Sequence, residues 1–82
     1  MATAKATKVT PITLAKVREK CNSASTVRLV KKHAGWVFDV QIEGQWCRWY
    51  DTKNSRPHYK KSVAAAVDFC RALGVVEMEL KP

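Results

Sequence analysis

Trp46, Arg48 and Tyr50 alternate along one segment of the chain, Gln45–Asp51. Alternate residues of a β-strand point to the same face of its sheet, so the two rings and the guanidinium group would share one surface. A guanidinium group can bind a phosphate or a guanine edge, and aromatic rings can pack against sugars, thymine methyl groups or unstacked bases. We therefore look for a binding function here first, and contact with a nucleic acid is the chemistry that these residue types suggest.

Three strands should position this surface: Thr26–Lys32, Trp36–Ile42 and Gln45–Asp51. Apolar residues recur at every second position of the middle segment, which is the period of a half-buried strand. Glu43-Gly44 fits a two-residue hairpin turn, because glycine tolerates the positive φ that such a turn requires. The turn places Ile42 opposite Gln45 and, by the same register, Val40 opposite Cys47.

Directly opposed residues share a face, so this register divides the predicted sheet into two surfaces. The inner, core-facing set is apolar: Val27, Leu29, Trp36, Phe38, Val40, Ile42, Cys47 and Trp49. The outer set is mixed and basic: Arg28, Val30, Lys32, Val37, Asp39, Gln41, Trp46, Arg48 and Tyr50. A register shift of one residue would exchange the two faces.

Two helices should flank these strands. Pro11 suits the first turn of a helix, with Thr10 as its cap, and the apolar spacing that follows predicts a helix from Pro11 to about Asn22. Ser62 can cap a second helix, which Gly74 would end. Its apolar stripe consists of Val63, Ala66, Val67, Cys70 and Leu73.

The order of these elements predicts an α+β fold, α-β-β-β-α, with a three-stranded antiparallel sheet and both helices on one face. Alternation of Val76, Met78 and Leu80 suggests a possible short fourth strand near the C-terminal end. Residues 11–82 would form this single domain. Residues 1–10, rich in Ala, Thr and Lys without apolar periodicity, would form a flexible basic tail.

Basic residues outnumber acidic ones, with 15 Lys and Arg against 7 Asp and Glu and a net charge of +8. The excess is clustered in the chain, which suits a polyanionic partner. One cluster is Arg28, Lys31 and Lys32, and the other is Lys53, Arg56, Lys60 and Lys61.

The chain begins without an apolar signal segment and contains no stretch as long as a membrane span, so we expect a soluble, cytoplasmic protein without a membrane partner. Cys21, Cys47 and Cys70 are widely spaced and odd in number, which favours buried thiols in a reducing compartment.

Catalytic and metal chemistry are not indicated. The carboxylates do not converge with an oriented base, and Asp39 should instead pair with Arg48 across the hairpin. Cys47, His58 and Cys70 lack paired metal-ligand spacing, and the three glycines stand singly rather than in a phosphate loop. We therefore expect no enzyme activity, no metal and no cofactor.

Two families share parts of this pattern. Gly35-Trp36, the aromatic third strand and the Ala64–Ala66 helix resemble the three-stranded-sheet DNA-binding domains of the APETALA and ethylene-response type and the arm-binding domains of tyrosine recombinases. That resemblance implies a sheet inserted into the major groove of DNA. The α-β-β-β-α order and Lys60-Lys61 before an Ala-rich helix also resemble a double-stranded-RNA-binding domain, which implies RNA contacts through the second helix and loops.

The sequence therefore predicts a small basic protein that binds nucleic acid, with duplex DNA on the outer sheet face favoured over RNA. Double-stranded-RNA binding through the second helix and loops, single-strand binding, and a small regulator of the plasmid or phage type that binds another protein stay open as alternatives. The oligomeric state is not indicated. The predicted contact residues are Arg28, Lys32, Gln41, Trp46, Arg48, Tyr50, Lys53, Arg56, Lys60 and Lys61.

Overall fold

Three long strands form the centre of the sheet: β2 (Val27–Lys32), β3 (Gly35–Ile42) and β4 (Gln45–Asp51). The computed structural model of the chain describes residues 9–51, 53 and 55–82. Strand β3 pairs antiparallel with both neighbours, and its register with β4 joins Ile42 to Gln45 and Val40 to Cys47. The predicted hairpin register is confirmed. Glu43 and Gly44 have φ values of 53° and 80°, as a two-residue turn between twisted strands requires.

The predicted three-stranded antiparallel sheet is wrong, because three short strands extend it to a six-stranded mixed sheet. Strand β1 (Thr10–Ile12) runs parallel to β4, and β6 (Glu79–Lys81) runs parallel to β2. The strand order is β1-β4-β3-β2-β6, and β5 (Arg56–Pro57) pairs antiparallel with β4 outside that order. The possible short strand predicted near the C-terminal end is present as β6, although it begins only at Glu79. Strands β1 and β5 were not predicted, because strands of two or three residues have too few positions to show an alternating pattern.

Helix α1 (Leu14–Lys20) begins later than predicted, because Pro11 lies within β1 opposite Arg48. Thr13 caps it instead of Thr10, accepting a hydrogen bond from the Lys16 N–H at 3.2 Å. Of the predicted tail, residues 1–10, the first eight lie outside the described residues. Thr10, its last residue, belongs to β1.

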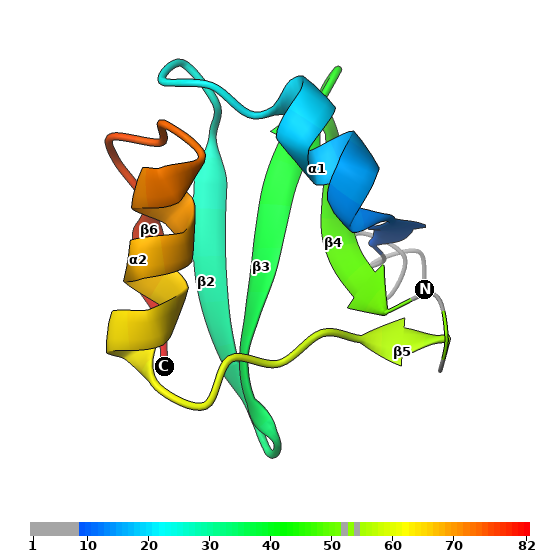
Figure 1. Ribbon diagram of the computed structural model, residues 1–82, viewed down its shortest axis with the longest axis vertical. Coiled ribbons are helices and arrows are strands. Elements are labelled where there is room, and N and C mark those ends of the chain that lie inside the picture. Colours follow the sequence, from blue (N-terminus) through cyan, green and yellow to red (C-terminus); the bar gives the residue numbers. More distant parts are fainter. Residues whose placement is uncertain (1–8, 52, 54) are drawn as a thin grey trace, which may run out of the picture.

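Helix α2 (Val63–Ala72) begins where predicted. The Ser62 hydroxyl accepts a hydrogen bond from the Ala65 N–H at 3.2 Å, and Gly74 follows the helix with a φ of 90°. Both helices lie on the same side of the sheet, α1 over the β4 end and α2 over the β2 end (Figure 1). They enclose one core in which Val17 from α1 and Cys70 from α2 pack with the inner residues of the sheet.

Trp49 is the central aromatic residue of this core and is 7% exposed. The His58 ring stacks on one side at 3.9 Å between centroids, and the Phe69 ring stacks at 4.6 Å. His58 reaches this position because the chain after β4 folds back and its N–H donates to the Trp49 carbonyl at 2.9 Å. Trp49 thus ties the returning segment and α2 to the sheet.

All three cysteines are buried and free, which confirms the prediction of buried thiols. Burial raises the pKa of each thiol, that of Cys70 to about 12. In the part of the chain that the structure describes, neither helix is long and apolar enough to cross a membrane.

The two faces of the hairpin should respond differently to mutation. Trp49→Ala removes a core ring stacked on two partners and should cost about 3–5 kcal/mol in the free energy of unfolding. Trp46→Ala, on the opposite face, should cost about 1 kcal/mol. Urea unfolding followed by circular dichroism measures both, and a larger loss from Trp46→Ala would contradict the assignment of the faces.

Stability should also depend on pH through His58. Burial, with a smaller contribution from the charge of Lys60, lowers the pKa of His58 below its ordinary value of 6.5. The unfolded chain therefore binds a proton more readily, so the stabilisation is complete above pH 6.5 and is lost as the pH falls through the folded pKa. His58→Phe keeps a stacked ring and should remove this part of the dependence between pH 7.5 and 5.5. His33→Asn, in the exposed β2–β3 turn, serves as the control and should retain it.

Candidate nucleic-acid interface

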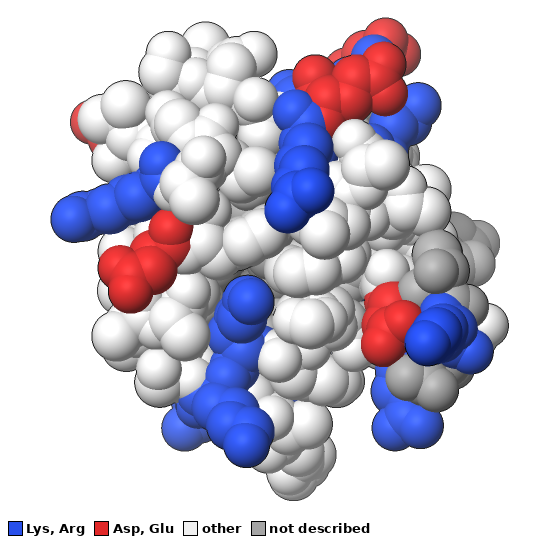
Figure 2. All heavy atoms as spheres, viewed as in Figure 1, with Lys and Arg blue, Asp and Glu red and all other residues white. Residues whose placement is uncertain are grey.

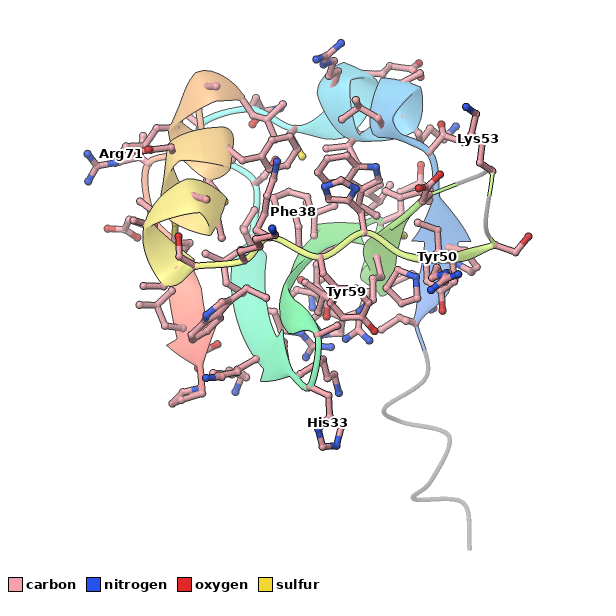
Figure 3. All side chains as sticks on the ribbon, turned by 60° about the horizontal axis from the view of Figure 1, so that its bottom comes forward. His33, Phe38, Tyr50, Lys53, Tyr59 and Arg71 are labelled. Carbon is pink, nitrogen blue, oxygen red and sulfur yellow. The ribbon has the colours of Figure 1, made fainter. Side chains whose placement is uncertain are left out.

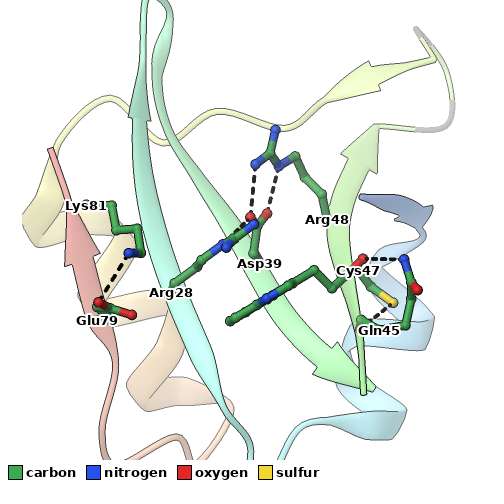
Figure 4. A network of polar contacts seen from close by, with 8 residues as sticks. Arg28, Asp39, Gln45, Cys47, Arg48, Glu79 and Lys81 are labelled. Atoms are coloured by element: carbon green, nitrogen blue, oxygen red, sulfur yellow. Dashed lines mark hydrogen bonds and ion pairs between the residues drawn. The ribbon is translucent and has the colours of Figure 1, made fainter. Parts of the chain in front are cut away.

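The outer face of the sheet is organised by an ionic network centred on Asp39. The Arg28 Nε donates to its Oδ2 at 2.8 Å, and the Arg48 Nε donates to its Oδ1 at 2.7 Å. A second Arg48 nitrogen donates to Oδ2 at 2.9 Å. Figure 4 shows how the three side chains come from adjacent strands β2, β3 and β4. The Asp39–Arg48 pair predicted from the hairpin register is confirmed.

This network is largely withdrawn from solvent. The Asp39 side chain is 0% exposed, and those of Arg28 and Arg48 are 18% and 13% exposed. The hydrogen bond to Asp39 raises the pKa of Arg48. The carboxylate accepts hydrogen bonds from one nitrogen of Arg28 and two of Arg48, so a phosphate or a base edge would have to compete with it for these donors.

Trp46 covers part of the same network. The Arg28 guanidinium carbon lies 4.0 Å from the centroid of its ring, and the ring is half-buried. Val37, also on this face, is fully buried. The outer face is therefore less open than the sequence suggests, although Gln41 is exposed and Tyr50 is half-buried.

The predicted basic segment from Lys53 to Lys61 divides into two places. Lys53 in the β4–β5 connection and Arg56 at the start of β5 are exposed, and the Lys53 N–H donates to the Asp51 carboxylate at 3.0 Å. Lys60 and Lys61 lie just before α2 and its cap, Ser62. Figure 3 shows Lys53 well away from His33, which marks the tip of the β2–β3 turn.

That turn and the residues before α2 together form what we call the basic end of the molecule: Lys31, Lys32, His33, Tyr59, Lys60 and Lys61. A shallow hollow of about 650 Å³ there is lined by Lys31, Lys32, His33 and Tyr59. The two lysine pairs are far apart in the sequence, so the tertiary fold brings them to one end.

Backbone hydrogen bonds hold the two parts of the basic end together. The Trp36 N–H donates to the Lys60 carbonyl at 2.8 Å, and the Lys60 N–H donates to the Trp36 carbonyl at 2.9 Å. Gly35 has a φ of 143°, and a Cβ at this position would collide with the Lys60 carbonyl. A residue without a side chain is therefore needed for this close approach.

The four lysines differ in their surroundings. The Lys60 ammonium lies 5.4 Å from the Trp49 ring centroid and 5.2 Å from that of Phe69, so aromatic rings hold it against the core. Lys31, Lys32 and Lys61 are exposed. Among the residues that the structure describes, none of the four forms an ion pair.

The space-filling view supports a local excess of positive charge. Toward the lower end of the helix-bearing face, where Figure 1 shows the β2–β3 turn and the start of α2, Lys and Arg spheres lie without touching Asp or Glu spheres (Figure 2). The first turn of α2 also contains no acidic residue, so its positive end is not neutralised locally. A polyanion is the ligand that such a surface favours.

The predicted contact residues thus fall into three groups: the outer face with Arg28, Gln41, Trp46, Arg48 and Tyr50; the β4–β5 connection with Lys53 and Arg56; and the basic end with Lys32, Lys60 and Lys61. Lys31, His33 and Tyr59 were not among them. The basic run Lys31-Lys32-His33 in the sequence could have indicated Lys31 and His33, whereas no local pattern indicated Tyr59. Within the described part of the chain, no three His, Cys, Asp or Glu side chains are grouped to hold a metal ion.

Comparison with protein-family models, with curated proteins and with solved structures finds no match for this chain. The two resemblances noted in the sequence therefore stay predictions. The outer face and the basic end are the surfaces whose geometry bears on function.

Removing the carboxylate at the centre of the outer face should destabilise the fold. Asp39→Asn keeps the side-chain volume but leaves two largely buried guanidinium groups without a counter-charge, so we expect a loss of about 3–5 kcal/mol. Asp68→Asn, which changes the same group at an exposed position on α2, should change stability by less than about 0.5 kcal/mol. Urea unfolding of both variants tests this, and a loss below 1 kcal/mol for Asp39→Asn would show that the network is not needed for folding.

Proposed function

We propose that this protein binds nucleic acid by contacting phosphates with its basic end. The observation that carries the proposal is that two lysine pairs from distant parts of the chain flank the start of β3. Lys31 of β2 pairs with Trp36, and Lys60 is hydrogen-bonded to Trp36 on its other side. Neither pair has a carboxylate partner among the described residues. A phosphodiester backbone presents regularly spaced negative charges, and releasing its counterions favours binding to such a cluster.

Duplex DNA is the expected ligand, and the outer sheet face is a second contact surface. Gln41 is exposed and Tyr50 is half-buried there, so these side chains could contact a groove without disrupting the Asp39 network. Arg28 and Arg48 are less suited to this role, because recruiting either of them would leave the buried carboxylate with a single partner.

An RNA duplex is the second candidate. It is favoured by the position of the Lys60-Lys61 pair, which precedes the Ser62 cap of α2 and lies beside the first residues of β3, as the resemblance to double-stranded-RNA-binding domains implies. Contacts confined to phosphates carry no sequence information directly, so either duplex should be bound with little sequence preference.

Replacing the lysines of the turn should weaken duplex binding more than an equal loss of charge elsewhere. Lys31→Gln with Lys32→Gln removes two phosphate contacts, which should lower affinity about 30-fold near 0.15 M salt and make the slope of log K against log salt about 2 units shallower. Lys16→Gln with Lys20→Gln on α1 removes the same charge and should lower affinity less than about threefold. Fluorescence anisotropy with labelled DNA and RNA duplexes of one sequence, between 50 and 200 mM salt, measures both.

Two results would contradict this model. Equal losses from the two lysine pairs would mean that net charge alone attracts the duplex. A larger loss from Gln41→Ala or Tyr50→Ala than from the turn lysines would assign the main contact to the outer face. The free energy of unfolding of each variant should be measured in parallel, so that a folding defect is not read as a binding defect.

A further inference from the structure

The two edges of the sheet differ in how they are protected. Strand β1, at one edge, has Pro11 at its centre, and a proline has no N–H to offer an added strand. Strand β6, at the other edge, is Glu79-Leu80-Lys81, and among the described strands only β2 pairs with it. The β6 edge is therefore open to a further strand.

Apolar side chains gather along this same edge. Among the described residues, the large hydrophobic side chains that stand exposed are Val63, Val76 and Leu80, at 36%, 71% and 48%. Val67 on α2 and Met78 before β6 line a groove beside them. Figure 1 shows α2 in front of β6, and Val67 and Arg71 of α2 line the same groove as Met78 and Leu80.

The charge of this edge differs from that of the rest of the molecule. The stretch from Asp68 to Lys81 contains three carboxylates, Asp68, Glu77 and Glu79, and two cations, Arg71 and Lys81, in a chain whose net charge is +8. A polyanion has little reason to bind here, whereas a second basic molecule would meet no strong repulsion.

We infer that two copies of this chain associate through β6, paired antiparallel about Leu80. Identical strands related by a two-fold axis within one sheet must run antiparallel. Pro82 follows the strand directly, so only a register centred on Leu80 uses all three residues. This register places Leu80 opposite its own copy and Glu79 opposite the other copy's Lys81, twice by symmetry.

The charge pattern of β6 is thus complementary to itself. Glu79 and Lys81 already lie on one face, with Nζ and Oε2 3.3 Å apart and both side chains largely exposed (Figure 4). In the dimer each charge gains an opposite charge across the strands, while the Leu80 side chains meet on the other face beneath the two α2 helices. Two sheets would join into one.

Charge reversal and restoration test this inference. Analytical ultracentrifugation of the full chain without nucleic acid should show a dimer that forms with rising concentration. Glu79→Lys places like charges opposite each other at both symmetric positions and should raise the dimer dissociation constant about tenfold. Adding Lys81→Glu to that variant should return the constant to within about threefold of the original. Glu19→Lys on α1 makes the same change in net charge away from the edge and should have less than a threefold effect.

Leu80→Asp provides a second measurement, because it places two carboxylates at the centre of the interface and should abolish the dimer. Circular dichroism should show that this variant remains folded, since Leu80 is half exposed in the single chain. A chain that stays monomeric at several hundred micromolar overturns the inference and leaves the edge to an extended segment of another protein. A dimer that responds to neither Glu79→Lys nor Leu80→Asp overturns it as well.

Discussion

The arrangement of the outer face depends on one fully buried carboxylate. Asp39 lies at the centre of β3 and binds Arg28 from β2 and Arg48 from β4, so one side chain links all three long strands. A buried charge without partners is strongly destabilising, and this fixes the strand register as firmly as the apolar core on the other face does. A one-residue slip would move Asp39 into that core.

The same network limits what the outer face can do. Guanidinium groups recognise phosphates and guanine edges well when they are free, but here both are held by Asp39 and one is also covered by Trp46. The aromatic and basic side chains of these strands therefore have their partners within the protein. The charge that remains available lies at the basic end, where lysines meet without carboxylates, and this difference decides which surface we propose for the polyanion.

The long strands, their register and the start of α2 could be predicted because their signals are local: alternation along β3, a Glu-Gly turn and a capping serine. Strands β1 and β5 could not, because two or three residues carry no period and each depends on a distant partner. Pro11 illustrates this, since it suits a helix start equally well. The alternation of Val76, Met78 and Leu80 did indicate a short last strand, but not that β6 would cover only Glu79–Lys81 and run parallel to β2. The basic end was only half predictable: the sequence marks each lysine pair, but the hydrogen bonds between Trp36 and Lys60 bring them together.

The geometry of the proposed dimer keeps its two basic ends independent of each other. A two-fold axis midway between the two Leu80 residues, perpendicular to the joined sheet, places the two basic ends on opposite sides of the axis because β2 runs in opposite directions in the two copies. The two ends could then hold separate duplexes, or separate points on one, without sharing contacts. Binding of a short duplex to one chain should therefore not require the dimer, whereas bridging of two duplexes would. Linking two sites in this way raises avidity only where the nucleic acid spans both.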